Sequence, residues 1–237
     1  MTTTPQQLSL GVSLNDDATF ANFYAPDAHQ NAQIVAALRA QIEVAAEPFI
    51  YLWGAPGCGL THLLQAACHQ AQMMGKTFQY FPLRDLAGYA PEELFAELEM
   101  LDFIVLDALD EVVGRPEWES ALFNLYNRLR DSGRLLLVAA IHGPQELAVN
   151  LADLKSRLQW GAVFHVHYLD DAEKQSALQF RARARGLELS DEVANYIIQR
   201  LPRDMNELFW QLNRLDHASL SEQRKLTIPF VKKVLGI

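Results

Sequence analysis

Residues 49–62 place a glycine-rich turn between an apolar segment and a helical pattern, and they constrain the fold more than any other stretch. The apolar run from Phe49 to Trp53 predicts a buried strand, and the leucines and alanines from Leu63 onwards predict a helix. A strand, a glycine-rich loop and a helix in this order are typical of a P-loop, in which backbone N–H groups and a helix N-terminus surround phosphate oxygens. The alternative is a tight strand-to-helix turn that is glycine-rich for purely structural reasons.

The P-loop pattern G-x-x-x-x-G-K-[ST] is met here except at one position. Gly54, Gly59 and Thr61 match it, but Leu60 stands where the lysine belongs. That lysine normally places its charge against the β- and γ-phosphates, so its loss predicts weaker nucleotide binding and poorer stabilisation of the transition state. Two outcomes stay open: a nucleotide held by backbone amides and Thr61, or no nucleotide at all. The candidate nucleotide-binding residues are Gly54, Ala55, Pro56, Gly57, Cys58, Gly59, Leu60, Thr61 and His62.

Strands alternate with helices in the first two thirds of the chain, and helices alone follow. Near-continuous apolar runs at 77–81, 103–106, 134–141 and 162–166 add strands to the one before the P-loop. Helical spacing appears at 31–44, 91–100 and 116–131, and then at 171–185, 190–200, 204–220 and 228–235. Apolar strands that alternate with helices favour a parallel sheet covered on both faces. We therefore expect a flexible polar tail at 1–19, an α/β nucleotide-binding-type domain of about five strands at 20–167, and an all-α domain at 168–237.

Charge and cysteine content argue against several classes of protein. The net charge of -9 speaks against indiscriminate binding to nucleic acid, because a duplex would repel most of this surface. Two cysteines, Cys58 and Cys68, lie on one short element, which favours a reducing compartment and no disulfide framework. Residues 1–19 lack the basic start and apolar core of a secretory signal, and no apolar run approaches the ~20 residues of a membrane span. We expect a cytoplasmic protein without a membrane segment.

Asp107 ends the apolar run that starts at Phe103. A carboxylate at the C-terminal end of a buried strand matches the second ATPase motif, in which it binds Mg²⁺. Together with the Thr61 hydroxyl it would form the metal site if a magnesium nucleotide is bound. Hydrolases of this type often have a second acidic residue next, whereas this chain has Ala108. Asp107 is therefore either a metal ligand or simply the residue that ends a core strand.

Five segments follow one another along the chain in a characteristic order: residues 19–23, 50–64, 122–128, 154–161 and 224–232. In this order they resemble the Hda family, the DnaA-related AAA+ proteins that inactivate the bacterial replication initiator DnaA. The resemblance runs from the N-terminal tail to the last residue. It implies an AAA+ P-loop sheet followed by a small helical lid. No helix-turn-helix segment follows the expected lid, which fits the regulator rather than the initiator.

The resemblance places an arginine finger at Arg157, with Lys155 and Ser156 shaping its loop. A guanidinium inserted into a neighbouring site stabilises charge on a transferring phosphoryl group. The implied role of Arg157 is to promote hydrolysis of ATP bound to DnaA, in trans. From the residues alone, an arginine flanked by leucines is more often a surface residue beside a packing face.

The resemblance also assigns Gln7, Leu8, Ser9 and Leu10 to a motif that docks into the sliding clamp, the β subunit of DNA polymerase III. The two leucines would fill an apolar pocket and Gln7 would make a polar anchor as the tail folds into a groove. The implied partners are DnaA and the clamp, with DNA reached indirectly through the clamp. Association with a second copy of this chain is left open.

Three features of active ATPases of this kind are missing. Leu60 replaces the P-loop lysine, residues 139–141 end a strand without a polar sensor, and Asn206 occupies the position of the lid arginine. Arg203 lies about one turn too early to substitute. These losses predict that hydrolysis within this chain is dispensable, so that the protein is a regulator rather than an enzyme. If a nucleotide binds this chain, the resemblance implies ADP as a stabilising ligand near Gly54 to Thr61 rather than as a substrate.

Two other functions stay open. One is an active ATPase of the helicase-loader type, and the other is an AAA+-derived interaction module that needs no nucleotide. The densest basic cluster consists of Arg181, Arg183 and Arg185. Because a spacing of two spreads side chains around a helix, this cluster favours a solvated lid face over a DNA contact.

Overall fold

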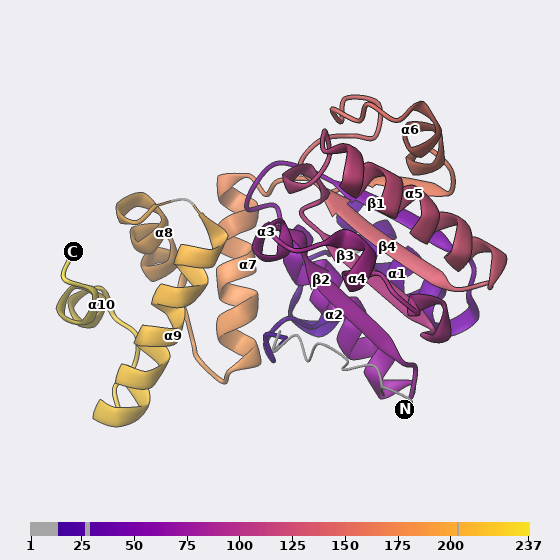
Figure 1. Ribbon diagram of the computed structural model, residues 1–237. Helices are drawn as coiled ribbons and strands as arrows, with labels where there is room; N and C mark the ends of the chain where they lie inside the picture. Colours follow the sequence, from indigo (N-terminus) through magenta and orange to yellow (C-terminus); the bar gives the residue numbers. More distant parts are fainter. Residues whose placement is uncertain (1–13, 27–28, 203) are drawn as a thin grey trace, which may run out of the picture.

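The computed structural model describes residues 14–26, 29–202 and 204–237. Two parts are visible, an α/β body and a group of helices beside it (Figure 1). The expected clamp-docking motif at residues 7–10 lies outside the described residues, as does Arg203. None of the helices within the described part of the chain is long and apolar enough to cross a membrane.

The body is built on a five-stranded parallel sheet, as predicted. Its strands run in the order β2-β3-β4-β1-β5 and pair in parallel throughout. Their bounds are β1 Phe49–Trp53, β2 Phe78–Pro82, β3 Phe103–Asp107, β4 Leu135–Ala140 and β5 Ala162–His165. Strand β1 lies between β4 and β5, so that Trp53 is opposite both Ala140 and His165.

Helices cover both faces of this sheet, which explains the continuous apolar runs. Along β1, Ile50 and Leu52 pack on one side, against α1 (Gln30–Val44) and α2 (Leu60–Met73). Phe49 and Tyr51 pack on the other side, where the covering helices are α3 (Leu83–Leu86), α4 (Pro91–Leu94), α5 (Pro116–Asp131) and α6 (Ala152–Leu158). Short 3-10 helices occur at Phe20–Asn22, Leu98–Met100 and Leu109–Glu111.

The helix predicted over residues 91–100 is wrong in its second half. Helix α4 ends at Leu94, and Glu97 has a left-handed backbone with φ of 58° before the 3-10 turn at Leu98. The carbonyl oxygen of Phe95 accepts a hydrogen bond from the Arg128 guanidinium, with Nη2 at 2.5 Å. Arg128 thus joins the end of this segment to α5, and the left-handed backbone at Glu97 interrupts the helical pattern.

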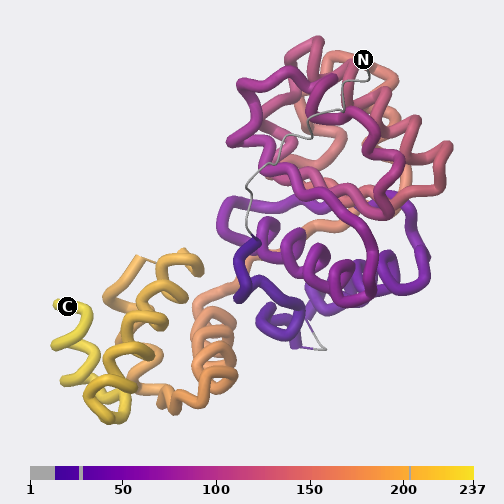
Figure 2. Tube along the Cα trace, turned by 60° about the horizontal axis from the view of Figure 1, so that its bottom comes forward, coloured from indigo at the N-terminus to yellow at the C-terminus, as the bar shows by residue number. Residues whose placement is uncertain are grey.

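The second part consists of four helices with a core of their own. These are α7 (Asp171–Ala184), α8 (Asp191–Arg200), α9 (Met205–Glu222) and α10 (Ile228–Leu235), close to the predicted bounds. Each begins at a side chain that caps its first turn: Asp170, Ser190, Asp204 and Thr227. The tube in Figure 2 shows that these helices stand beside the body and continue from β5.

Residues 14–19 belong to the folded body, and the prediction of a flexible tail is wrong for them. The Asn15 amide donates to Gln65 on α2 at 3.1 Å, and the Asn15 carbonyl contacts the His69 ring at 3.1 Å. The Thr19 side chain caps the 3-10 helix that follows. Figure 2 shows this indigo segment between the body and the helices of the second part. The backbone of this segment is thus bonded to α2 while Asn15 and Asp16 stay exposed, which composition could not reveal.

Candidate functional site

Strand β1 and helix α2 hold the predicted P-loop between them. Gly54 follows β1 directly, and a Cβ at this position would stand 2.6 Å from the carbonyl oxygen of Val166. Gly57 and Gly59 have φ angles of 83° and 102°, in the left-handed region. Gly59 is also the N-cap of α2 and has no side chain to cap it. The amides of the first turn of α2 can therefore face an anion, as in a phosphate site.

Leu60 takes the place of the lysine and packs inward. Its side chain is partly buried against the apolar cluster between the sheet, α1 and α2. The P-loop thus offers backbone N–H groups without an ammonium group. Binding of a phosphate here would rest on backbone dipoles and hydroxyls, which carry less charge than the usual lysine.

Thr61 and Asp107, the two predicted metal ligands, lie together. The Thr61 hydroxyl donates to Oδ2 of Asp107 at 2.7 Å, and the Tyr80 hydroxyl donates to the same oxygen at 2.6 Å. Asp107 is 7% exposed, and burial beside this carboxylate raises the pKa of Tyr80 far above its usual value. Carboxylate and hydroxyl oxygens are the donors that Mg²⁺ prefers, so this pair fits a magnesium nucleotide.

A mostly apolar pocket adjoins the P-loop and is shared with the helical part. Phe23 covers Gly59 so closely that a Cβ there would stand 2.8 Å from its ring. The apolar and aromatic walls suit a flat heterocycle next to a phosphate site. The pocket is lined by Asn22, Phe23, Tyr24, Asn31, Gly57, Cys58, Gly59, His62, Leu169, Ala177, Met205, Asn206 and Phe209.

His62 fastens this pocket to the N-terminal segment. Its Nε2 lies 2.9 Å from the carbonyl oxygen of Thr19, and because a carbonyl can only accept, Nε2 carries the proton. Burial is the main cause that lowers the pKa of His62 to about 4. Arg181 nearby acts in the same direction. His62 is therefore a neutral structural residue at neutral pH.

The second part closes over the P-loop without an arginine at the expected place. Asn206 lines the shared pocket, as its position in the sequence predicted. A Cβ at Gly57 would stand 3.0 Å from Oδ2 of Asp204 and 3.7 Å from the Tyr168 ring. A carboxylate this close to the loop adds negative charge near the P-loop, which disfavours the binding of an anion.

The prediction of a solvated basic face on α7 is wrong for two of its three arginines. Arg181 is 6% exposed, and its Nη1 donates to the carbonyl of Asn22 at 2.9 Å. Arg185 donates to Asp17 at 2.5 Å and also to Asn213. Arg183 is the exposed member of the cluster. Arg181 and Arg185 therefore join the N-terminal segment to α7 and α9, and their role is structural.

Arg157 lies on α6 with its guanidinium against two aromatic rings. Leu154 and Leu158 of the same helix are buried in the core, which turns Arg157 outward. The guanidinium carbon stands 4.2 Å from the ring centroid of Trp160 and 6.0 Å from that of Tyr126. Among the described residues Arg157 forms no ion pair. Its N–H donors can therefore reach an external anion.

The fold separates Arg157 from the P-loop of its own chain. Gly161, just after α6, packs on the carbonyl of Phe49 at the start of β1, whereas the P-loop follows the end of β1. The length of β1 alone puts about 13 Å between these two edges of the sheet. Figure 1 shows α6 at the end of the body that lies away from helices α7–α10. Arg157 thus lies away from the P-loop of its own chain.

Glu119 is a buried charge that sequence reasoning missed. It is 2% exposed and accepts hydrogen bonds from the backbone amides of Gly114, Asn150 and Leu151. In the sequence it is one of two acidic residues in the first turn of a predicted helix, a common surface feature that complements the helix dipole. Nothing in that pattern distinguishes it from its exposed neighbour Glu117.

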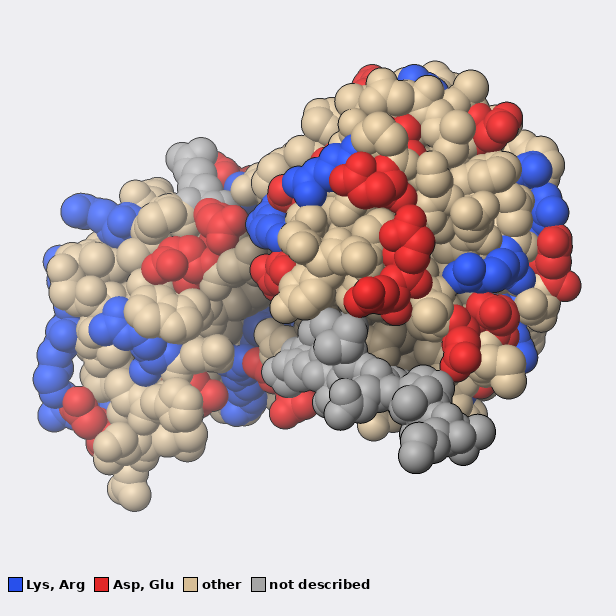
Figure 3. Space-filling model, viewed as in Figure 1, with Lys and Arg blue, Asp and Glu red and all other residues tan. Residues whose placement is uncertain are grey.

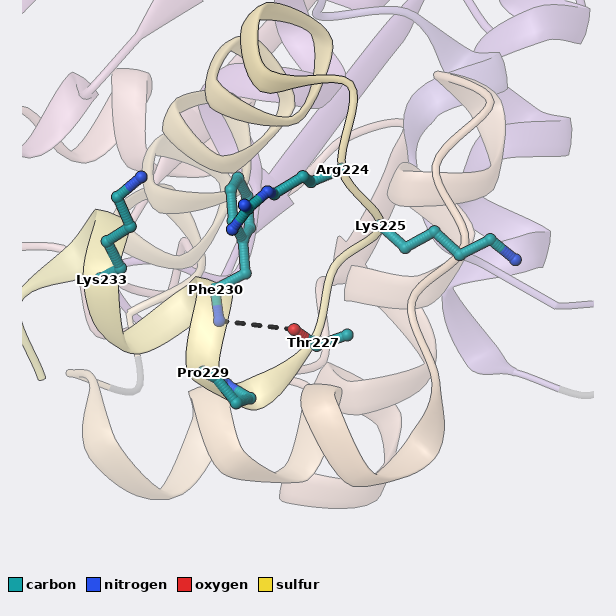
Figure 4. A pocket seen from close by; sticks show the side chains of 6 residues that line it. All are labelled: Arg224, Lys225, Thr227, Pro229, Phe230 and Lys233. Carbon is teal, nitrogen blue, oxygen red and sulfur yellow. Dashed lines mark hydrogen bonds between the residues drawn. The ribbon is translucent and has the colours of Figure 1, made fainter.

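Residues 224–232, one of the five segments that resemble the Hda family, contain the start of α10, and this helix start explains their residue types. Thr227 caps α10, Pro229 lies in its first turn, and Phe230 is buried in the helical core. Figure 4 shows the shallow pocket around this helix start, with the Phe230 amide donating to Thr227 at 3.4 Å. Lys233, at its edge, is paired with Glu222 at 2.8 Å. This pocket belongs to the packing of α10 and lies apart from the P-loop.

Charge is unevenly divided along the chain. Residues 1–170 carry 9 Lys and Arg against 20 Asp and Glu, whereas residues 171–237 carry 11 against 9. On the face in Figure 3, acidic side chains form a band over the body around α3 and α4. The body would therefore repel a nucleic acid, as the net charge predicted.

Two family models match the chain. Residues 14–165 match the bacterial DnaA ATPase domain, and residues 171–235 match the Hda lid domain. Domain III of the replication initiation protein DnaA from Thermotoga maritima has 22% identity and a TM-score of 0.75, covering 95% of this chain and 98% of that one.

Two further solved structures share the fold. AMPPCP-bound DnaA from Aquifex aeolicus has 24% identity and a TM-score of 0.72, with 84% of this chain and 65% of that chain covered. The RuvB Holliday junction branch migration motor from Thermotoga maritima has 15% identity and a TM-score of 0.67, with 92% and 73% covered. These likenesses show that the chain shares the fold of DnaA and RuvB, and helices α7–α10 lie in the part that matches the Hda lid domain.

Proposed function

The chain belongs to the bacterial DnaA ATPase family and carries an Hda-type lid, and from this premise we propose that it is a negative regulator of DNA replication initiation acting on DnaA. The proposed protein docks on the DNA-loaded sliding clamp and promotes hydrolysis of the ATP bound to DnaA. Arg157 supplies the guanidinium that reaches this ATP in trans. The protein would act in the cytoplasm, which suits its two free, buried cysteines.

The position of Arg157 is the observation that carries this proposal. Its guanidinium is held by aromatic rings rather than by a carboxylate, so its charge is uncompensated within the described chain. It lies at the opposite edge of the sheet from its own P-loop. An arginine that enters a second molecule's phosphate site in this way stabilises the charge that develops on the transferring phosphoryl group.

A nucleotide in this chain's own P-loop has a stabilising role in the proposal. The residues that would hold it are the backbone of Gly57 to Thr61, and Thr61 and Asp107 would share a Mg²⁺. ADP is the proposed ligand, because Leu60 leaves no cation to bind a γ-phosphate. Such a ligand would join the body to the lid across the shared pocket, and would thereby stabilise the fold.

The direct test mixes the protein, DNA-loaded clamp and ATP-bound DnaA, and follows conversion of the bound ATP to ADP. Acceleration over DnaA alone is expected, and it should depend on the clamp. Conversion no faster than that of DnaA alone overturns the proposal.

Clamp docking through Gln7, Leu8, Ser9 and Leu10 is the second part of the proposal. Leu10 stands five residues before Asn15, which is bonded to α2, so at most about 18 Å of chain joins the motif to the body. A docked clamp would therefore hold the body close beside it. This short connection favours a defined geometry over a loose tether.

Replacing Leu8 and Leu10 together by alanine is expected to weaken clamp binding by about 10²–10⁴-fold. The reason is the loss of two leucine side chains from an apolar pocket, at about 1.5–3 kcal/mol each. Surface plasmon resonance on immobilised clamp measures the change, with Val12→Ala as a control of similar kind outside the motif. Undiminished binding by the double variant would show that the clamp contacts another part of the chain.

An active ATPase of the helicase-loader type is the second candidate, favoured by the intact Thr61–Asp107 pair. We expect the isolated protein to show no Mg²⁺-dependent turnover above background, because the P-loop lacks its cation. Leu60→Lys should raise ADP affinity about tenfold or more in calorimetry, since it restores a charge-assisted hydrogen bond. Leu60→Met, which keeps the packing without the charge, should leave the affinity unchanged. Measurable turnover by the wild type would favour the ATPase.

A further inference from the structure

Glu119 fixes three loop amides near the start of α6. Its Oε1 accepts from the Gly114 amide at 2.8 Å and the Asn150 amide at 3.0 Å. Its Oε2 accepts from the Leu151 amide at 2.7 Å and the Asn150 amide at 3.1 Å. No ion pair of Glu119 with a basic residue occurs within the described part of the chain. A carboxylate that is 2% exposed and held only by backbone amides makes these amides adopt one geometry.

The first turn of α6 has no side-chain cap, and the residues just before this turn are fixed by Glu119. Leu151 is the N-cap residue of α6, and a leucine side chain cannot accept a hydrogen bond from the first turn. Glu119 instead accepts from Leu151 itself and from the residue before it. The start of α6 is thereby tied to α5, which packs along it.

The same helix α5 also meets the far end of α6. Tyr126 lies seven residues after Glu119 on α5, about 10 Å along the helix axis, and its ring faces the Arg157 guanidinium at 6.0 Å. Leu154 and Leu158 fill the space between these two contacts in the core. Helix α6 is thus held against α5 at both ends, and the orientation of Arg157 depends on both.

We propose that Glu119 is a positioning residue that sets the orientation of Arg157 by fixing the start of α6. This inference rests on the proposed action of Arg157 on ATP bound to DnaA. Without the carboxylate, the amides of Asn150 and Leu151 lose their acceptor, and α6 can shift on α5. A displacement of about 1 Å at a charge-stabilising group costs about 10²-fold in rate. The partner still binds, because the surface around Arg157 is retained.

The test compares Glu119→Ala, Glu119→Gln and Leu38→Ala. Glutamine keeps one acceptor oxygen for the start of α6. Leu38 is fully buried on α1, on the other face of the sheet, and serves as a control for general loss of stability. Two quantities are measured with DNA-loaded clamp and ATP-bound DnaA. One is the maximal rate at which the ATP on DnaA is hydrolysed, and the other is the concentration of each variant that gives half of this rate. Hydrogen exchange of residues 149–158 is followed separately, without DnaA.

Glu119→Ala is expected to lose about 10²-fold of the maximal stimulation with little change in the half-saturating concentration, and to exchange faster over residues 149–158. Glu119→Gln should lie between it and the wild type, and Leu38→Ala should keep its maximal stimulation. A folded Glu119→Ala or Glu119→Gln with wild-type stimulation and exchange overturns the inference, as does an equal loss in Leu38→Ala. If the wild type itself fails to stimulate DnaA, the proposed function falls, and the exchange measurement still decides whether Glu119 orders α6.

Discussion

Arg157→Ala is expected to abolish the acceleration of DnaA ATP hydrolysis, a loss of about 10³–10⁵-fold where an arginine finger provides the main charge stabilisation. The side chain is half-buried, and its contacts are the rings of Trp160 and Tyr126. Its removal should therefore leave the fold and clamp binding almost unchanged. The rate of ADP formation on DnaA, measured with saturating clamp and variant protein, reports the loss.

Two further variants separate charge from geometry. Arg157→Lys keeps a cation but loses the planar fork of donors, so it should recover little of the stimulation. Arg130→Ala removes an arginine that is already paired with its neighbour Asp131 at 2.8 Å, and should stimulate as the wild type does. Full stimulation by Arg157→Ala would instead favour an interaction module that needs no arginine finger.

Stability is expected to fall between pH 6.5 and pH 4 because of His62. Its pKa is lowered from 6.5 to about 4 in the folded protein. Above pH 6.5 the ring is neutral in both states and its contribution does not change. As the pH falls from 6.5 to 4, the unfolded chain takes up a proton that the folded chain does not, so the free energy of unfolding decreases by up to about 3 kcal/mol. Below pH 4 both states are protonated and the effect levels off.

Chemical denaturation at pH 7, 5.5 and 4.5 measures this dependence. His62→Gln should flatten the curve, because its amide keeps a donor near the carbonyl of Thr19 but does not titrate. His217→Gln is the matched control, since His217 is exposed on α9 and its replacement should leave the slope unchanged. Equal slopes for His62→Gln and the wild type would show that His62 is protonated equally in both states.

The fold was predictable where one local pattern and the core agreed. Strand β1, the P-loop and α2 form a single unit whose glycines and apolar runs have few other solutions. Asp107 was predicted to end a buried strand and to share a Mg²⁺ with Thr61 if a magnesium nucleotide is bound. The two side chains lie together with a hydrogen bond at 2.7 Å, and their role as metal ligands stays a prediction.

Predictions went wrong where one polar side chain bonds to a distant backbone group. Arg128 donates to the Phe95 carbonyl just after helix α4 ends, and Arg181 donates to the Asn22 carbonyl across 159 positions of sequence. Glu119 likewise bonds to the backbone, since it accepts hydrogen bonds from three backbone amides. In each case the residue type is common on helix surfaces, so its pattern in the sequence is that of a solvated residue. The partners are fixed only when the tertiary fold forms.

The most direct test of action in trans asks which molecule's nucleotide is hydrolysed. Labelled ATP is bound to DnaA alone in one single-turnover reaction, and added to this protein alone in another, before the components are mixed with DNA-loaded clamp. We predict that label on DnaA is converted to ADP and that label given to this protein stays unhydrolysed. Conversion of the second label, with the first left as ATP, would place the chemistry at the Leu60-containing P-loop and contradict a role for Arg157 in trans.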